Sequence, residues 1–221
     1  MIFSIPSSSS SSIQVQVLLL QNCSFIQKLV HAQKPTCVAA CINPKMMPSL
    51  FVLQTTLHHV VLAKNDSKEV ETDSTTSSSE SIATGSGNIN NSNVQTSSVG
   101  GWKTQNIHTE LLYKLNPKRN IGQAFKNFGA NDHSSEKAVL CVACKENENP
   151  NLEDYLISNF ITNEDDKKNL KIISDSKEID EYLKSHVDSQ AICKLFNFTK
   201  EELSNNLEDN MIMYLAVRDF N

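Results

Sequence analysis

Hydrophobic and polar residues alternate in two parts of the chain, and this alternation is typical of a strand with one buried face. Residues 13–19 show it with glutamines at the intervening positions, and residues 107–115 show it with polar and charged residues between the apolar ones. Residues 138–144 are apolar throughout and predict a central strand. Residues 170–173 predict a further short strand.

Apolar residues spaced three and four apart predict helices in most of the other segments. Pro48 is expected in the first turn of a helix that runs to about Lys64. Asn116 is expected to cap another helix, with Pro117 as its first residue and Gly129 at its end. Shorter helices are predicted around residues 24–31, 152–160, 175–186 and 189–196.

The last predicted helix has the clearest start signal. Thr199 and Glu202 have the spacing of a capping box, in which each side chain bonds the backbone N–H of the other residue. One apolar face follows, made of Leu203, Leu207, Met211, Tyr214 and Leu215, and Ile212 and Ala216 widen it. Such a face closes a core or docks a partner, and the core is the usual outcome for most of its residues.

Two polar tracts interrupt these patterns. Residues 1–12 end in six consecutive serines, and residues 65–101 contain ten serines, five threonines and five asparagines. Because such tracts bury too little apolar surface to offset chain entropy, we expect both to be disordered. Without these 12 and 37 residues, 172 of the 221 remain, which is enough for one domain with a proper core. We predict a single α+β domain over residues 13–221, with a mixed, mainly antiparallel sheet packed with helices and the long insertion at 65–101.

The composition argues against an enzyme. Of the six glycines, only Gly122 and Gly129 lie outside the polar tract, so no glycine-rich loop for a nucleotide can be built. The sequence has no G-x-S-x-G and no H-E-x-x-H motif. Apart from the adjacent His58 and His59, its histidines are isolated, and no pair of carboxylates has a suggestive spacing. We therefore expect no catalytic residues and no cofactor.

Neither of two suggestive residue pairs is expected to bind a metal. Cys141 and Cys144 have the spacing of half a zinc site, but positions three apart on a strand face opposite sides of the sheet. His58 and His59 are adjacent on a predicted helix and point in different directions, so we expect a partly exposed pair.

No segment approaches the ~20 apolar residues of a membrane span. The apolar start of the chain is too short for a signal peptide. We therefore expect a protein of the nucleus and cytosol with no membrane partner and free cysteines.

Charge is unevenly distributed along a chain whose net charge is −5. Residues 101–128 carry five basic residues against Glu110 alone, a net charge of +4. Residues 146–181 carry eleven acids against four lysines, a net charge of −7. A local basic face is the minimal requirement for contact with nucleic acid, and a merely solvated helix face is the alternative.

The run from Trp102 to Gly129 resembles the TPRKB family, the kinase-binding subunit of the KEOPS/EKC complex. The landmarks that carry the resemblance are Lys103-Thr104, Glu110-Leu111, Leu115-Asn116-Pro117, Asn120-Ile121, Ala124 and Phe128-Gly129. Further similar stretches are Ile42-Asn43-Pro44, residues 154–157, residues 207–213 and Arg218-Asp219. The resemblance covers most of residues 13–64 and 102–221. The serine-rich N-terminus and the insertion at about 66–100 depart from the family pattern.

The resemblance implies a subunit that performs no chemistry itself. Family members bind a PRPK-type atypical kinase/ATPase at its N-lobe, and contact other KEOPS subunits indirectly. They thereby join the complex that makes N6-threonylcarbamoyladenosine in tRNA, while another subunit carries the transferase chemistry. On the similar C-terminal helix, we expect Met211, Ile212, Tyr214 and Leu215 to bind the kinase.

A second, weaker expectation concerns tRNA. Archaeal relatives also help to hold the acceptor end of tRNA, and the candidate contacts here are Lys114, Lys118, Arg119 and Lys126. A tRNA-binding module that works without the kinase is therefore the alternative reading. An enzyme with scattered catalytic residues is a third.

Overall fold

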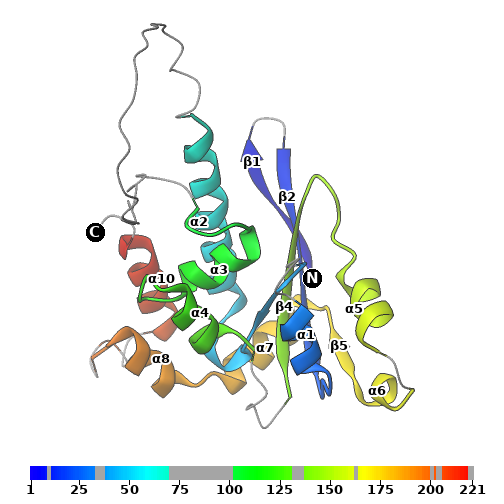
Figure 1. The fold of residues 1–221 in the computed structure, drawn as a ribbon. Coiled ribbons are helices and arrows are strands. Elements are labelled where there is room, and N and C mark those ends of the chain that lie inside the picture. Colours follow the sequence, from blue (N-terminus) through cyan, green and yellow to red (C-terminus); the bar gives the residue numbers. More distant parts are fainter. Residues whose placement is uncertain are drawn as a thin grey trace, which may run out of the picture.

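The computed structural model describes residues 1–8, 11–32, 38–69, 102–130, 137–161, 164–199, 202 and 206–218. A five-stranded antiparallel sheet lies between two unequal layers of helices (Figure 1). The strands are β1 (Ile2–Ser8), β2 (Ser11–Gln21), β3 (Ala40–Ile42), β4 (Val139–Glu146) and β5 (Lys171–Ile173). Their order is β1-β2-β4-β3, and β5 pairs with the far end of β2 on the edge that β1 also uses. The predicted α+β class is confirmed.

The sheet is covered on both faces because its two central strands are apolar at successive positions. In β2, Val17 and Leu19 pack into the larger core cluster, whereas Leu18 and Leu20 pack into the smaller one. The larger layer contains α2 (Leu50–Glu69), α3 (Ile107–Leu115), α4 (Ile121–Phe128), α7 (Ser176–His186), α8 (Ser189–Phe196) and α10 (Leu207–Arg218). The smaller layer contains α1 (Ile26–Ala32) and α5 (Leu152–Phe160). The remaining short elements are the 3-10 turn η1 (Pro44–Met46) and α6 (Glu164–Asn169).

The N-terminal residues differ from the expectation of disorder over 1–12. Residues 2–8 form β1, which pairs with the first half of β2 in an antiparallel hairpin. Ile5 is buried, and Phe3 packs against the same core. These two positions share one face of the strand, so the hairpin buries apolar surface that an isolated serine-rich tail would lack.

Residues 107–115 form the helix α3, so the predicted strand is wrong. Asn106 caps the helix, because its Oδ1 accepts the backbone N–H of Thr109 at 2.9 Å. Ile107, Leu111 and Leu115 are four residues apart, a spacing that fits one face of a strand and one face of a helix equally well. The burial of Leu112 beside Leu111 fits the helix and not a strand with one buried face.

The next helix begins four residues later than predicted. Asn120 caps α4 by accepting the N–H of Gln123, whereas the fully buried Asn116 ends α3. The Asn116 side chain instead donates to the backbone carbonyls of Lys118 and Asn120 and so shapes the loop between the helices. The helix ends at Gly129 as predicted, where a Cβ would collide with the carbonyl oxygen of Phe125.

The start and the end of α2 also differ from the prediction. Ser49 precedes the helix and its Oγ accepts the N–H of Val52 at 3.3 Å, so Pro48 lies outside. The backbone N–H of Leu50 donates a hydrogen bond to Oδ1 of Asp180 on α7 at 2.9 Å. The helix continues to Glu69, five residues into the tract that was expected to be disordered. The remainder of that tract, residues 70–101, lies outside the described residues.

Most elements of the C-terminal half are confirmed. The strand predicted at residues 138–144 is β4 (Val139–Glu146), residues 170–173 contain β5, and α5 and α8 have their predicted bounds. The capping box forms, with Thr199 N–H to Glu202 at 2.6 Å and Glu202 N–H to Thr199 at 3.2 Å. It lies upstream of the last helix, however, because α10 begins at Leu207 after Asn206, whose Oδ1 accepts the Glu208 N–H.

Candidate docking surface

The four residues expected to bind the kinase lie in different surroundings on α10. Met211 is fully buried and Leu215 is 4% exposed, so both belong to the core. Ile212 is half-buried and packs against that core. Tyr214 is 36% exposed. The structure therefore leaves Tyr214, and part of Ile212, within reach of a partner; kinase binding by these residues stays a prediction.

Two residues that the sequence analysis did not select dominate the outer face of α10. Met213 is 63% exposed and Val217 is 48% exposed. The helix is apolar on both its inner and its outer face, so the sequence pattern alone does not say which residues pack inward. The signal available in the sequence is the excess of apolar residues over what one buried stripe requires.

Tyr214 is held by an aromatic cluster that joins three helices. Its ring meets Phe196 edge-on at a centroid distance of 5.1 Å and Phe198 at 6.2 Å. Phe196 stacks on Phe198 at 5.3 Å and meets Phe128 of α4 edge-on at 6.5 Å. Because packed aromatic rings have few rotamers left, Tyr214 presents its exposed edge in a fixed orientation.

The helix α4 adds two further exposed apolar side chains. On this helix Ala124 and Phe128 are buried, whereas Ile121 is 37% exposed and Phe125 is 42% exposed. The helices α4, α8 and α10 lie together on the flank of the molecule away from α5 (Figure 1). We call the exposed residues of this flank the docking patch: Ile121, Phe125, Met213, Tyr214 and Val217.

The end of α10 is fastened to the loop between α3 and α4 by two arginines, which we call the arginine clasp. The buried guanidinium of Arg218 donates from Nη1 to the carbonyl oxygen of Asn116 at 2.6 Å and lies 6.0 Å from the centre of the Tyr113 ring. Arg119 donates from Nη2 to the carbonyl oxygen of Arg218, also at 2.6 Å. The clasp therefore fixes the last turn of α10 relative to α4.

The candidate tRNA contacts follow one stretch of the same flank. Lys114 is half-buried at the end of α3, Lys118 and Arg119 are exposed in the α3–α4 loop, and Lys126 is exposed in the last turn of α4. The nearby Glu110 is fully buried, and its Oε2 accepts the backbone N–H groups of Lys103 and Thr104. The Glu110 carboxyl group therefore does not lie on the surface where the basic residues are.

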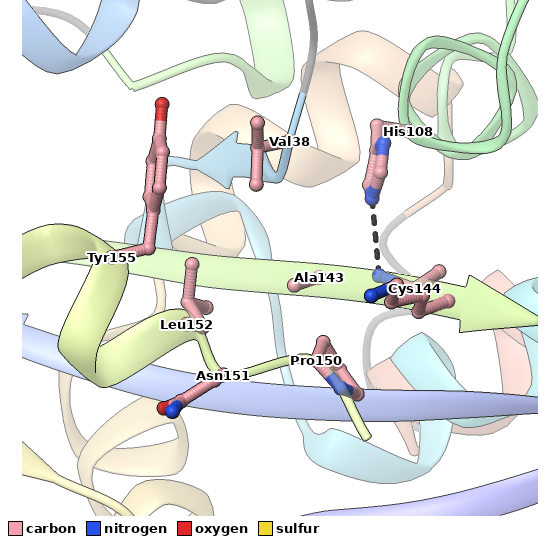
Figure 2. Close-up of a pocket in the computed structure, with 9 residues that line it drawn as sticks. Val38, His108, Ala143, Cys144, Pro150, Asn151, Leu152 and Tyr155 are labelled. Atoms are coloured by element: carbon pink, nitrogen blue, oxygen red, sulfur yellow. Dashed lines mark hydrogen bonds between the residues drawn. The ribbon is translucent and has the colours of Figure 1, made fainter. Parts of the chain in front are cut away.

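A pocket of about 340 Å³ lies on the other side of α3, between that helix, β4 and α5 (Figure 2). His108 and Tyr155 stand at its two ends with Val38 between them. Nε2 of His108 accepts the backbone N–H of Cys144 at 3.0 Å. The pairing of β3 with β4 stops at Ala40 opposite Val142, so the imidazole takes the place that the next carbonyl of β3 would occupy. The sequence analysis placed His108 on a strand and missed this role.

The cysteines and histidines give no metal centre among the described residues. Cys141 packs into the smaller core cluster and Cys144 against the larger one, which confirms that they face opposite sides of the sheet. Cys141 lies opposite Cys41 on β3, with their Sγ atoms 3.9 Å apart. The hydrogen bond with Cys41, together with burial, raises the pKa of the Cys141 thiol well above its usual value. His58 is exposed and His59 half-buried, as expected.

No helix among the described residues combines the length and the apolar character that a bilayer crossing requires.

Comparison with known proteins connects this architecture to a family. The family model of the kinase binding protein CGI-121 matches residues 16–219. The EKC/KEOPS complex subunit TPRKB of Danio rerio is 29% identical over 123 residues, which are 55% of this chain and 61% of the relative. The EKC/KEOPS complex subunits CGI121 of Candida glabrata and Candida albicans are 28% and 31% identical over 112 and 118 residues.

These two fungal alignments cover 49% and 50% of this chain, and 55% and 53% of the relatives. The chain thus spans between about half and three fifths of the length of the curated relatives it matches. The family model, by contrast, extends from β2 to the end of α10. The resemblance to the TPRKB family is confirmed, and the chain belongs to the family of the kinase binding protein CGI-121.

Proposed function

We propose that this chain is a non-catalytic subunit of a KEOPS/EKC-type complex and that it binds a PRPK-type atypical kinase through the docking patch. In that role it supports the N6-threonylcarbamoyladenosine modification of tRNA in the nucleus and cytosol. Membership of a kinase-binding family and the names of the relatives support the proposal. The observation that carries it is that α4 and α10, which are joined through Phe128, Phe196 and Tyr214, both keep exposed apolar side chains.

The docking patch has the properties of a binding surface and not of scattered exposed residues. Interfaces concentrate their energy in a few apolar or aromatic side chains near the centre of the contact. Tyr214 is already oriented by Phe196 and Phe198, so little side-chain entropy remains to be lost on binding. The arginine clasp and the aromatic cluster hold α10 against α4, which presents both helices as one rigid surface.

A subunit without chemistry can still change the activity of the kinase. If the kinase exchanges between conformations and the docking patch fits one of them better, binding shifts the population toward that conformation. The size of the shift equals the difference in binding affinity for the two conformations. This mechanism requires a complementary surface and no catalytic residue from this chain.

The direct test is to place a charge in the docking patch. Met213→Glu is expected to weaken binding of the purified kinase at least about tenfold, because a carboxylate would be desolvated inside an apolar contact. Isothermal titration calorimetry measures the affinity, and circular dichroism checks the fold. Leu62→Glu on α2 is the matched control, because Leu62 is 57% exposed and lies outside the docking patch. If Leu62→Glu weakens binding and Met213→Glu does not, the kinase docks elsewhere.

A tRNA-binding module is the second candidate function, favoured by the basic stretch on α3, the α3–α4 loop and α4. The burial of Glu110 removes the one acidic residue of that stretch from the surface. Each lysine that contacts a phosphate would contribute about 0.7–0.9 to the slope of log affinity against log salt concentration. Replacing Lys118 and Lys126 by glutamate should therefore lower the slope for tRNA, and an unchanged slope would remove both from consideration.

A further inference from the structure

The arginine clasp contains one arginine that is buried and one that is exposed. Arg218 is 8% exposed, and its guanidinium is enclosed by Tyr113 and the Asn116 carbonyl. Arg119 is exposed, and a single hydrogen bond from Nη2 connects it to the Arg218 carbonyl. The two contacts therefore differ in how readily a solute can compete for them.

The carbonyl that Arg119 contacts lies at the end of α10. The last carbonyls of a helix have no partner within the helix and carry its partial negative charge, so a cation placed there stabilises the last turn. Arg119 supplies this cation from the α3–α4 loop, and the outer face of the same turn carries Val217 of the docking patch. The position of Arg119 thus influences part of the docking patch without contacting a partner.

The loop that carries Arg119 also carries exposed positive charge. Lys118 is the preceding residue and is exposed, and Lys126 is exposed in the last turn of α4. A guanidinium matches the two oxygens of a phosphate with two parallel hydrogen bonds, which are stronger than one bond to a neutral carbonyl. A phosphate placed beside Lys118 would therefore compete with the end of α10 for Arg119.

We propose that Arg119 is a shared residue, which holds either the end of α10 or a phosphate of a nucleic-acid backbone at the α3–α4 loop. Binding of nucleic acid then withdraws Arg119 from the Arg218 carbonyl and loosens the last turn of α10. This inference rests on the proposed function in one respect: the loosened turn carries part of the surface proposed to dock the kinase. Kinase docking and nucleic-acid binding are then coupled negatively, and the coupling is reciprocal by thermodynamic linkage.

The coupling can be measured in the full chain without the kinase. The probe is a short RNA hairpin at low ionic strength, and the readout is hydrogen exchange at the backbone amides of residues 214–218. Saturating RNA is expected to accelerate exchange at these amides about fivefold, the lower end of the range typical for coupled sites. In Arg119→Gln, exchange is expected to be fast before RNA is added and to change no further. Lys118→Gln is the matched control, which binds RNA more weakly but keeps the acceleration at saturation.

Three results would overturn the inference. The first is that the chain does not bind RNA at low ionic strength. The second is that RNA binds but leaves the hydrogen-exchange rates of α10 unchanged. The third is that the α10 amides of Arg119→Gln exchange as slowly as those of the wild type. A thermal melt of Arg119→Gln verifies that the variant is folded.

A second arm uses the kinase. RNA should lower the apparent kinase affinity about fivefold in the wild type and leave that of Arg119→Gln unchanged. Equal kinase affinity with and without RNA in the wild type would contradict the coupling. If the wild-type chain does not bind the kinase, the proposed function is refuted. The hydrogen-exchange measurement would still test whether RNA releases Arg119 from the Arg218 carbonyl.

Discussion

Met211 and Met213 are two residues apart on α10, and their side chains have opposite surroundings. Met211 is fully buried in the larger core cluster, whereas Met213 is 63% exposed in the docking patch. Truncation of the first removes packed atoms and leaves a cavity, while truncation of the second removes atoms that already contact water. The pair therefore separates the two roles of one helix.

The corresponding prediction concerns the free energy of unfolding. Met211→Ala should lower it by about 2–5 kcal/mol, in the range measured for buried methionine and leucine. Met213→Ala should change it by no more than about 0.5 kcal/mol, as is usual for surface positions. Urea denaturation followed by circular dichroism measures both. Equal destabilisation by the two variants would mean that the orientation of α10 is wrong.

His108 gives a second prediction at the scale of a single residue. Because its Nε2 accepts the Cys144 N–H, replacement by leucine leaves a backbone donor without this acceptor. A buried donor without an acceptor costs about 1–3 kcal/mol. Because the Cys144 N–H is only partly buried, His108→Leu should lower the free energy of unfolding by about 1 kcal/mol, the lower end of that range. His58→Leu on the exposed side of α2 is the control and should have an effect within about 0.5 kcal/mol. An equal effect of both would show that the hydrogen bond contributes nothing.

Helices and strands show where the sequence pattern is sufficient and where it is not. The helices α7 and α8 and the apolar run of β4 could be predicted, because each is a local signal. The assignment of residues 107–115 failed because a repeat of four fits both a strand and a helix. The strand β1 could not be predicted from its own residues, since it depends on pairing with β2.

The docking patch lies beyond sequence prediction for a related reason. Both faces of α10 are apolar, and only the contacts with α2 and α8 decide that Met211 and Leu215 turn inward. The contact between Arg119 and Arg218 joins residues that are 99 positions apart in the sequence, so no local sequence pattern predicts it. The C-terminal helix was selected because its sequence resembles that of the family. Which of its residues are accessible depends on the three-dimensional packing.

The two ends of the 65–101 tract meet at one place in the fold. Lys64 forms an ion pair with Glu146 at 3.1 Å, and its Nζ lies 5.5 Å from the centre of the Trp102 ring. Nε1 of Trp102 donates to the carbonyl oxygen of Val60 at 2.7 Å. Both sides of the tract are therefore anchored on α2 by contacts that do not involve residues 70–101.

This arrangement predicts that the tract can be shortened. Replacing residues 70–101 by a short Gly-Ser linker should leave the fold intact, because each halving of a flexible loop changes its closure free energy by only about 0.6 kcal/mol. Trp102 is the single tryptophan of the chain, so its fluorescence emission reports directly on the anchor. An unchanged emission maximum is expected. A shift toward the emission of solvent-exposed tryptophan would mean that the tract helps to hold Trp102 on α2.

The whole molecule presents surfaces of different character. The flank of α4 and α10 combines the docking patch with the basic α3–α4 loop, and α5 and α6 lie on the opposite side of the sheet (Figure 1). Residues 152–169, which contain α5 and α6, carry five acidic residues against two lysines, a net charge of −3. This separation suits the proposed binding of a partner on one flank.

The most direct measurement of the central claim is a hydrogen-exchange footprint of the chain with and without its purified kinase partner. Kinase binding through the docking patch predicts slower exchange in α4 and α10, with α5 and the exposed side of α2 unchanged. Protection confined to α5 or α2, or no protection at saturating kinase, would contradict the account.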